Sequence, residues 1–510
     1  AREPGEDAPR TRAGEARMTG FRPPADAWSR RDVLRNGTYS VALLCTFGTQ
    51  ASLRRPRVVT SAARRSQANS PFAPFQRDLP IMPELSPISR AQGVDFYALD
   101  IKESLAEILP GFETPIYGYG GIYPGPTIRA RKGRPAVVRQ TNRLPFDTNV
   151  HLHGGYVPAS SDGYPMDLIP PGGHFDYTYP NEQDAAYLWY HDHAHGRTAR
   201  TLYYGLTAAY LLGDDREEEL ELPTGEYDVP LVLADHAFNK DGSFRYAENV
   251  DLGFRGDTIV VNGAIVPRMA VQRRIYRLRF LNASNARSYE LQLGQGRTML
   301  QIASDGGLLP RPVARSSFPI HPAERIEVLI DFRGFRKGSE LVLTNTAGEA
   351  TTRNIMRFDV VGGGGAEEFR MPRGRMRTME KLPRPNARRR FDLSLATGLN
   401  VQWQINGRGF DTSRVDARPR LGSTELWQWH NPSNRVHPMH IHGSLQRVVE
   451  RSSGVVHPGE RGWKDTVGVQ PGETVTVRPW FVPYTGLYVF HCHNNEHGDK
   501  AMMGQLEVVR

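Results

Sequence analysis

The chain has 510 residues, a length typical of two to four domains, and a formal net charge of +9. Its two cysteines exclude a disulfide-stabilised scaffold, and its 50 glycines and 38 prolines favour short strands and turns over helix bundles. The positive charge does not indicate a nucleic-acid partner, because it is concentrated in two segments: the first 65 residues, with 13 arginines against 6 acidic residues, and residues 366–391.

The N-terminal segment has the pattern of an export signal. Arg30 and Arg31 precede a weakly apolar stretch, residues 41–47, and no stretch reaches the roughly 18 apolar residues that span a bilayer. This pattern is similar to a twin-arginine signal, so we expect residues 1–70 to be a signal and basic tail, and the mature protein to start after about residue 50. The small-residue stretch 60–63 is one possible cleavage region. The protein would then be exported to the periplasm, cell envelope or medium without stable membrane insertion, and Cys45 would leave with the signal. The alternative is a disordered basic tail.

Three β-rich blocks follow, each with a glycine turn and an asparagine shortly after: residues 123–142 ("YPGPTIRARKGRPAVVRQTN"), 261–284 and 405–433. Period-two alternation in "RIYRLRFL" (274–281) and "TVTVRPWFV" (474–482) indicates half-buried strands. We therefore predict an all-β fold of three consecutive Greek-key β-sandwich domains. The expected domain bounds are 71–220, 221–362 and 391–510, with the basic, glycine- and proline-bearing segment 363–390 as a linker.

Ten of the 16 histidines fall in four short segments, and each segment contains a His-x-His pair. The segments are "HLHGG", "WYHDHAHG", "HPMHIHG" and "HCHNNEH", with His151 and His153, His191 and His193, His437, His440 and His442, and His491, His493 and His497. A single histidine is usually a core or surface residue, but four such pairs in one chain indicate a metal cluster.

Strand geometry predicts how the pairs are used. Residues i and i+2 of a strand face the same side, roughly 6.5–7 Å apart, so two such imidazoles suit neighbouring metals better than one shared metal. Four pairs supply eight ligands, too many for one four-coordinate zinc. The sequence therefore predicts a multinuclear centre.

Cys492 lies between His491 and His493, so in a continuous strand its thiol points to the opposite side, toward a second metal site. His437 differs in parity from His440 and His442, and His497 and Met502 follow Cys492 at steps of five. Two histidines, one cysteine and a weak methionine are the blue-copper ligand set. A one-electron site joined by a short covalent path to a multinuclear site is suited to four-electron reduction of dioxygen.

The chain resembles the multicopper oxidases over roughly residues 75–510, and within them bacterial spore-coat laccases and bilirubin oxidases. The resemblance rests on these motifs: "YPGPTI", "HLHGG…SDGYP", "LWYHDHA", "EYDVPL", "FLNASNAR", "IASDGGLLPRPV", "PAERIEVLIDF", "HPMHIH", "GWKDTV" and "HCHNNEHGDKAMM". It implies three cupredoxin-like domains and four copper ions, with the trinuclear cluster between the first and third domains.

By motif position, the resemblance implies a type 1 copper held by His437, Cys492, His497 and axial Met502. It implies a type 2 copper held by His151 and His440, and two type 3 coppers held by His153, His191 and His493 and by His193, His442 and His491. The six other histidines are expected not to be ligands: His174, His195, His236, His321, His430 and His457.

Two acidic residues are candidates for proton delivery. Asp162 in "SSDGYP" matches a family acid near the trinuclear cluster, although a turn residue before Gly163 is the alternative. Relatives carry a glutamate directly after the counterpart of His497, where this chain has Gly498. We expect Asp499 or an ordered water to take over its role.

The resemblance implies a laccase that oxidises phenols or aromatic amines and reduces dioxygen. The segments near the type 1 position look short, which predicts an open site with broad specificity, and we expect a monomer. One alternative is a cuprous metallo-oxidase, for which Met371, Met376 and Met379 would be a soft metal patch. A second is a non-catalytic cupredoxin-fold envelope protein. A copper nitrite reductase is disfavoured, since it needs two domains and fewer His-x-His pairs.

Overall fold

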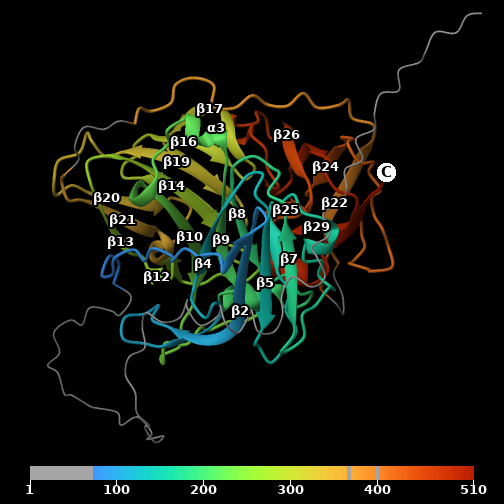
Figure 1. The fold of residues 1–510 in the computed structure, drawn as a ribbon, viewed down its shortest axis with the longest axis horizontal. Helices are drawn as coiled ribbons and strands as arrows, with labels where there is room; N and C mark the ends of the chain where they lie inside the picture. Colours follow the sequence, from blue (N-terminus) through green and yellow to red (C-terminus); the bar gives the residue numbers. More distant parts are fainter. Residues whose placement is uncertain (1–72, 364–368, 397–400) are drawn as a thin grey trace, which may run out of the picture. The chain divides into compact units, whose positions relative to one another are not determined.

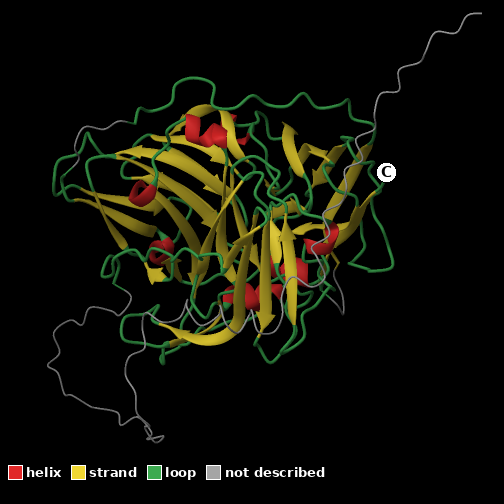
Figure 2. Ribbon diagram, in the orientation of Figure 1, coloured by secondary structure: helices red, strands yellow, loops and turns green. Residues whose placement is uncertain are grey.

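The computed structural model describes residues 73–363, 369–396 and 401–510. The predicted export signal lies outside the described residues. Among those that are described, no helix is both long and apolar enough to cross a membrane. The described part of the chain is nearly all β, as predicted (Figure 2). Its α-helices are single turns, α2 (Thr198–Tyr203), α3 (Asp215–Glu219) and α4 (Asn495–Asp499). The 3-10 helices are η1 (Ala159–Ser161), η2 (Gly225–Tyr227), η3 (Ala350–Thr352) and η4 (Pro458–Glu460).

The first nine strands form two sheets. One has the order β1 (Ser89–Ala91), β2 (Val94–Ala106), β5 (Ala136–Asn142) and β7 (His174–Tyr179), with β3 (Thr114–Tyr119) also on β2. The other has the order β4 (Gly125–Arg131), β9 (Thr207–Gly213), β8 (Ala186–His191) and β6 (His151–His153). Both sheets contribute to one apolar core, with Ile101, Val138 and Tyr210 among its members. Burial of such side chains stabilises the sandwich.

The next twelve strands also form two sheets. A seven-stranded sheet has the order β12 (Ala264–Ile265), β11 (Thr258–Val261), β10 (Asp228–His236), β14 (Ile275–Asn282), β19 (Arg325–Asp331), β16 (Met299–Ser304) and β17 (Gly307–Arg315). A five-stranded sheet has the order β13 (Arg268–Val271), β21 (Asn354–Val360), β20 (Glu340–Asn345), β15 (Tyr289–Leu293) and β18 (Ser317–Ile320). These strands lie on the left of Figure 1.

The last nine strands form a third pair of sheets. One has the order β23 (Gln402–Ile405), β22 (Arg388–Ala396), β24 (Leu426–His430), β28 (Thr474–Trp480) and β26 (Leu445–Arg451). The other has the order β27 (Thr466–Val469), β25 (His437–Ile441), β29 (Gly486–Cys492) and β30 (Met503–Val508). The predicted linker runs without helix or strand from residue 369 to residue 387, and its last three residues begin β22.

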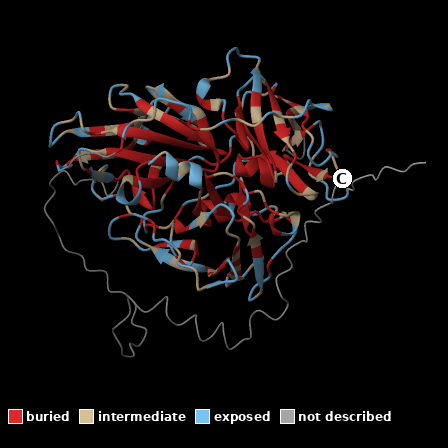
Figure 3. Ribbon diagram, turned by 45° about the horizontal axis from the view of Figure 1, so that its top comes forward, coloured by how far each residue is buried: buried red, intermediate tan, exposed pale blue. Residues whose placement is uncertain are grey.

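Figure 3 shows the buried residues concentrated in these sheets. Strand β14 departs from the predicted half-buried pattern, because all eight of its residues are buried. The polar half of its alternation includes Arg277 and Arg279, which pair with Glu327 and Asp228 inside the sheet rather than with water. The two arginines alternate with apolar residues as predicted, but buried carboxylates, not water, surround their charged groups.

Candidate metal centres

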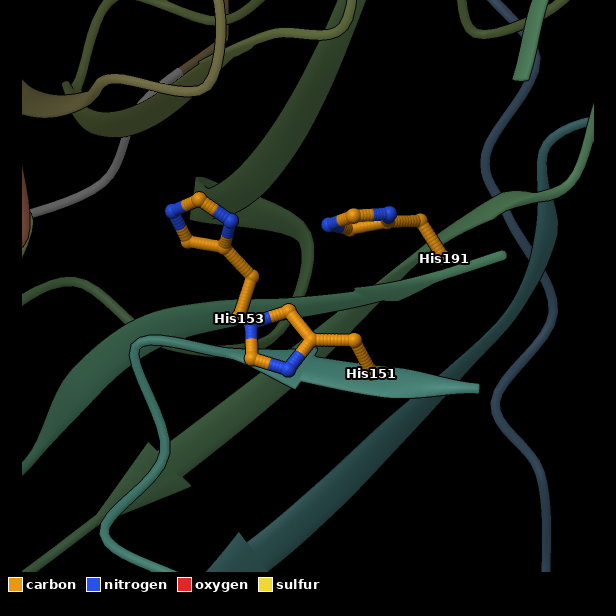
Figure 4. A group of neighbouring side chains, drawn as sticks. All are labelled: His151, His153 and His191. Carbon is orange, nitrogen blue, oxygen red and sulfur yellow. The ribbon is translucent and has the colours of Figure 1, made fainter. Parts of the chain in front are cut away.

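All ten predicted histidines and Cys492 are buried. Strand pairing brings eight of the histidines together, since β6 and β8 are neighbours with His151 opposite His191, and β25 and β29 are neighbours with His440 opposite His491. Figure 4 shows His151, His153 and His191 rising from the strands β6 and β8 toward one space. The two four-stranded sheets thus contribute histidine pairs to one cluster.

The eight histidines form a compact group, the histidine cluster: His151, His153, His191, His193, His440, His442, His491 and His493. The rings of His153 and His440 stack at 3.7 Å, and those of His151 and His442 stack at 3.8 Å. The Nε2 atom of His491 lies 3.0 Å from Nε2 of His193 and 3.1 Å from Nε2 of His442. Three imidazole nitrogens that converge on one point in this way are arranged as metal ligands are.

The nitrogens of this cluster fit a metal centre. Buried ring nitrogens are normally hydrogen-bonded, but six of these histidines have a buried nitrogen with no hydrogen-bond partner in the structure: His151, His153, His191, His193, His440 and His493. Burial lowers the pKa of His151 and His442 well below the usual value, which leaves neutral imidazoles with free lone pairs. Bound copper ions would satisfy these atoms.

The opposite ring nitrogens are held by the protein. The carbonyl of Asp162 lies 2.6 Å from Nδ1 of His151, and its carboxylate lies 2.8 Å from Nδ1 of His442. The Asp465 carbonyl lies 3.1 Å from Nδ1 of His440, and its carboxylate lies 2.9 Å from Nε2 of His153. Such contacts fix which nitrogen faces a metal.

Sequence reasoning singled out neither Asp465 nor its partner Arg325. Both side chains are fully buried, and Nη1 of Arg325 donates to Oδ1 of Asp465 at 2.8 Å. Their motifs, "GWKDTV" and "PAERIEVLIDF", contain the signal, since each places a charged residue in an otherwise strand-forming run. The pair ties β19 to the histidine cluster.

A second group lies beside the first. The Cys492 sulfur is 3.5 Å from Nδ1 of His437 and 3.7 Å from Nδ1 of His497, and these two nitrogens are 3.3 Å apart. Met502 is buried in the same core, and its carbonyl accepts a hydrogen bond from the Cys492 amide at 3.1 Å. Trp403 packs against both imidazoles, with ring centroids 4.5 and 4.6 Å away.

This second group, the Cys492 triad, also fits a metal. Burial raises the pKa of the Cys492 thiol, while a bound metal ion deprotonates a coordinating thiol outright. Burial lowers the pKa of His437 to about 3, so its imidazole is neutral. Within β29, Cys492 belongs to the triad while His491 belongs to the histidine cluster, in agreement with strand alternation.

The Cys492 triad is not open as the short neighbouring segments suggested. His437 and His497 are both buried, and the backbone carbonyl of Asp251 lies 3.1 Å from Nε2 of His497. This covering loop comes from the segment between β10 and β11, far away in sequence, so the length of the segments near His497 did not predict it.

The two acidic candidates for proton delivery, Asp162 and Asp499, differ in their contacts. Asp162 is fully buried, and its Oδ1 has no hydrogen-bond partner. Asp499 accepts hydrogen bonds from the amides of Thr198 and Ala199, at 3.2 and 2.7 Å, at the start of α2. Burial raises the pKa of Asp499 to about 8. Gly498 lies in α4, where an added Cβ would approach the Cys492 carbonyl to 3.1 Å.

The six histidines expected not to be ligands lie outside both groups within the described residues. His195 packs against Phe410 with ring centroids 5.0 Å apart, and His236 contacts the Tyr123 hydroxyl at 2.8 Å. His457 caps η4 through the amide of Gly459.

Comparison with known proteins is consistent with this geometry. Two multicopper oxidase family models match residues 100–210 and 383–510. A laccase from Bacillus stratosphericus is 37% identical, with 86% of this chain and 99% of the relative covered. A bilirubin oxidase from Albifimbria verrucaria is 34% identical over 91% of this chain and 87% of its own length. The crystal structure of a laccase from Pediococcus acidilactici superimposes with a TM-score of 0.79 at 31% identity, covering 87% of this chain and 97% of that one.

The chain therefore belongs to the multicopper oxidase family, and its three pairs of sheets are cupredoxin-like sandwiches. Family membership makes it a copper-dependent oxidoreductase with oxygen as electron acceptor.

Proposed function

We propose that this multicopper oxidase is a laccase that couples one-electron oxidation of phenols or aromatic amines to the four-electron reduction of dioxygen to water. The observation that carries the proposal is β29, where Cys492 belongs to one buried ligand group and the adjacent His491 to another. Copper ions, when bound, would accept the electrons singly and deliver them to dioxygen. The two peptide units beside Cys492 supply a short covalent path between the groups.

We propose four copper ions. The type 1 ion would take the Cys492 triad with Met502 as axial ligand, and the type 2 ion would take His151 and His440. The type 3 ions would take the two remaining sets, His153, His191 and His493, and His193, His442 and His491. The unpartnered buried nitrogens of six of these rings support this assignment. The close approach of the Nε2 atoms of His193, His442 and His491 supports it as well.

Two carboxyl groups are proposed to move protons. Asp162 contacts His442 directly and has a free oxygen, so it can pass a proton toward the histidine cluster. Asp499 is proposed as the group that takes over where relatives have a glutamate at the position of Gly498. Its contacts with the α2 amides give it a structural role as well.

We also propose that the protein is exported through the twin-arginine-type segment around Arg30 and Arg31, and that it acts as a monomer. N-terminal sequencing of protein recovered outside the cytoplasm tests the first point. A mature chain that retains residues 1–40 would contradict it. Sedimentation of the copper-loaded protein tests the second.

Oxygen uptake by the copper-loaded protein tests the activity, with a methoxyphenol and cuprous ion assayed in parallel. The laccase proposal expects fast uptake with the phenol and little with cuprous ion, and the reverse result would favour a metallo-oxidase. A metallo-oxidase is disfavoured, because Met376 is buried in an apolar cluster with Phe369 and Leu309 rather than exposed in a methionine patch. No uptake with either reductant would favour a non-catalytic protein.

A further inference from the structure

The loop that covers His497 is anchored by three successive backbone carbonyls. The Val250 carbonyl accepts a hydrogen bond from Trp403 Nε1 at 2.9 Å, and the Leu252 carbonyl accepts one from Asn494 Nδ2 at 3.2 Å. Between them, the Asp251 carbonyl lies 3.1 Å from Nε2 of His497. We call residues 250–252 the strap. All three anchoring side chains belong to the Cys492 triad or its immediate surroundings.

The conformation of the strap is fixed locally. Asn249 receives hydrogen bonds from the amides of Leu252 and Gly253, at 3.0 and 2.8 Å. Gly253 has a φ of +71°, and a Cβ there would lie 2.4 Å from Cβ of Ala286, so only glycine fits. The strap therefore has a fixed conformation over His497.

The outer face of the strap is exposed and bordered by arginines. The side chain of Asp251 is 46% exposed and pairs with Arg435 through two hydrogen bonds, at 3.2 and 2.7 Å. Leu252 is 40% exposed. Arg255, three residues further on, is exposed, and no ion pair or hydrogen bond to its guanidinium is found among the described residues.

The charges around Arg255 leave it uncompensated. Its neighbour Arg287 is already paired with Asp235, and Arg435 with Asp251, while Glu349 caps η3. Desolvation by the surrounding protein and, to a smaller extent, repulsion by Arg287 lower the pKa of Arg255.

We propose that Arg255, beside the Arg435–Asp251 pair, forms an anion subsite that binds the carboxylate or sulfonate of an aromatic reductant and holds its ring on the strap above His497. Guanidinium groups recognise such anions through paired hydrogen bonds. This inference rests on the proposed laccase function. The bound phenol loses one electron toward His497 and its hydroxyl proton to solvent, which leaves a phenoxyl radical. Dioxygen is the final oxidant.

Kinetics with a matched pair of reductants tests the subsite. Syringol is a dimethoxyphenol, and syringate is the same phenol with a carboxylate opposite the hydroxyl. We expect Arg255→Ala to raise the ratio of the syringate KM to the syringol KM about fivefold, and Arg255→Glu to raise it further. Asp251→Asn should lower the ratio, because it frees Arg435 from its carboxylate partner. The control is Arg311→Ala on the edge strand β17, an exposed arginine outside this surface.

Calorimetric binding of trimethoxybenzoate gives a second readout without turnover, since this ligand has no phenolic hydroxyl to oxidise. Copper-loaded wild-type protein should bind it, and Arg255→Glu or added salt should weaken binding severalfold. A KM ratio and a binding constant that do not respond to Arg255 would overturn the subsite, even if both phenols are oxidised. Arginine-dependent binding without oxidation of either phenol would instead overturn the laccase proposal and leave the subsite standing.

Discussion

Asp465 holds His153 from the side opposite the histidine cluster. Its carboxylate lies 2.9 Å from Nε2 of His153, and Nδ1 of the same ring is buried without a partner. An ionised carboxylate accepts the Nε2 proton, so Nδ1 carries the free lone pair. Arg325 and His153 hold the pKa of Asp465 well below its usual range despite burial, which keeps it ionised. The orientation of His153 thus depends on Asp465 of the third sandwich and, through it, on Arg325 of the middle sandwich.

Asp465→Asn should weaken both folding and metal binding. It removes the nearer of the two carboxylates beside the buried Arg325 guanidinium and leaves Asp305 at 3.9 Å, which costs roughly 3 kcal/mol of unfolding free energy. Copper affinity should fall about 10- to 100-fold, because His153 loses its fixed tautomer. Urea unfolding of the copper-free protein measures the first effect, and copper retained after dialysis against a chelator measures the second. Asp176→Asn, which removes a half-exposed pair with Arg139, is the control and should cost less than about 1 kcal/mol.

Gly498→Glu should be tolerated and should speed turnover. A Cβ at this position would lie 3.1 Å from the Cys492 carbonyl, so that carbonyl must shift by a few tenths of an ångström. The φ of Gly498 is not positive, so a side chain there is not strained. Replacing a helical glycine also removes a penalty of roughly 1 kcal/mol. The added carboxyl would supply the group that the family resemblance leads us to expect at this position, so the oxygen-uptake rate should rise severalfold. An unchanged rate in a normally folded variant would show that proton delivery does not limit turnover.

Comparison of two variants of Asp499 distinguishes a structural role of this residue from a role in proton transfer. Asp499→Ala removes the acceptor for the Thr198 and Ala199 amides and should cost about 1 kcal/mol, whereas Asp499→Asn retains an acceptor oxygen and should cost less. If Asp499 moves protons, both variants should slow oxygen uptake at least about tenfold. Normal uptake by Asp499→Ala at acidic and neutral pH would exclude the relay.

Asp228 should contribute to acid stability. Burial raises the pKa of Asp228, but the guanidinium of Arg279 and other nearby arginines outweigh that effect and hold the pKa at about 2. Because the folded-state pKa is below the unfolded value of about 3.9, the carboxylate stabilises the fold above pH 4 by roughly 2.5 kcal/mol, and this is lost as the pH falls toward 2. Asp228→Asn should therefore be destabilised most near neutral pH.

Urea unfolding of copper-free protein between pH 7 and pH 2 measures this dependence. The gap between wild type and Asp228→Asn should narrow as the pH falls. A gap of constant size would show that Asp228 has the same pKa in both states. Asp257→Asn, which removes an exposed contact with Arg245, is the matched control.

The sequence predicted what depends on local spacing. The all-β fold follows from period-two runs and glycine turns, and the separation of Cys492 from His491 follows from alternation along one strand. The sequence did not predict contacts between residues that are distant in sequence. Arg277 and Arg279 read as solvent-facing because their carboxylate partners lie on other elements, such as Glu327 on β19. Asp465 and the strap over His497 were missed for the same reason.

Copper content of the loaded protein, measured together with its visible absorption, tests the central claim most directly. The account predicts four copper ions per chain in the wild type, with the blue absorption of a copper–thiolate site. It predicts three ions and no blue absorption in Cys492→Ser, because the histidine cluster remains intact. Fewer than four ions in the fully loaded wild type, or blue absorption that survives the substitution, would contradict it.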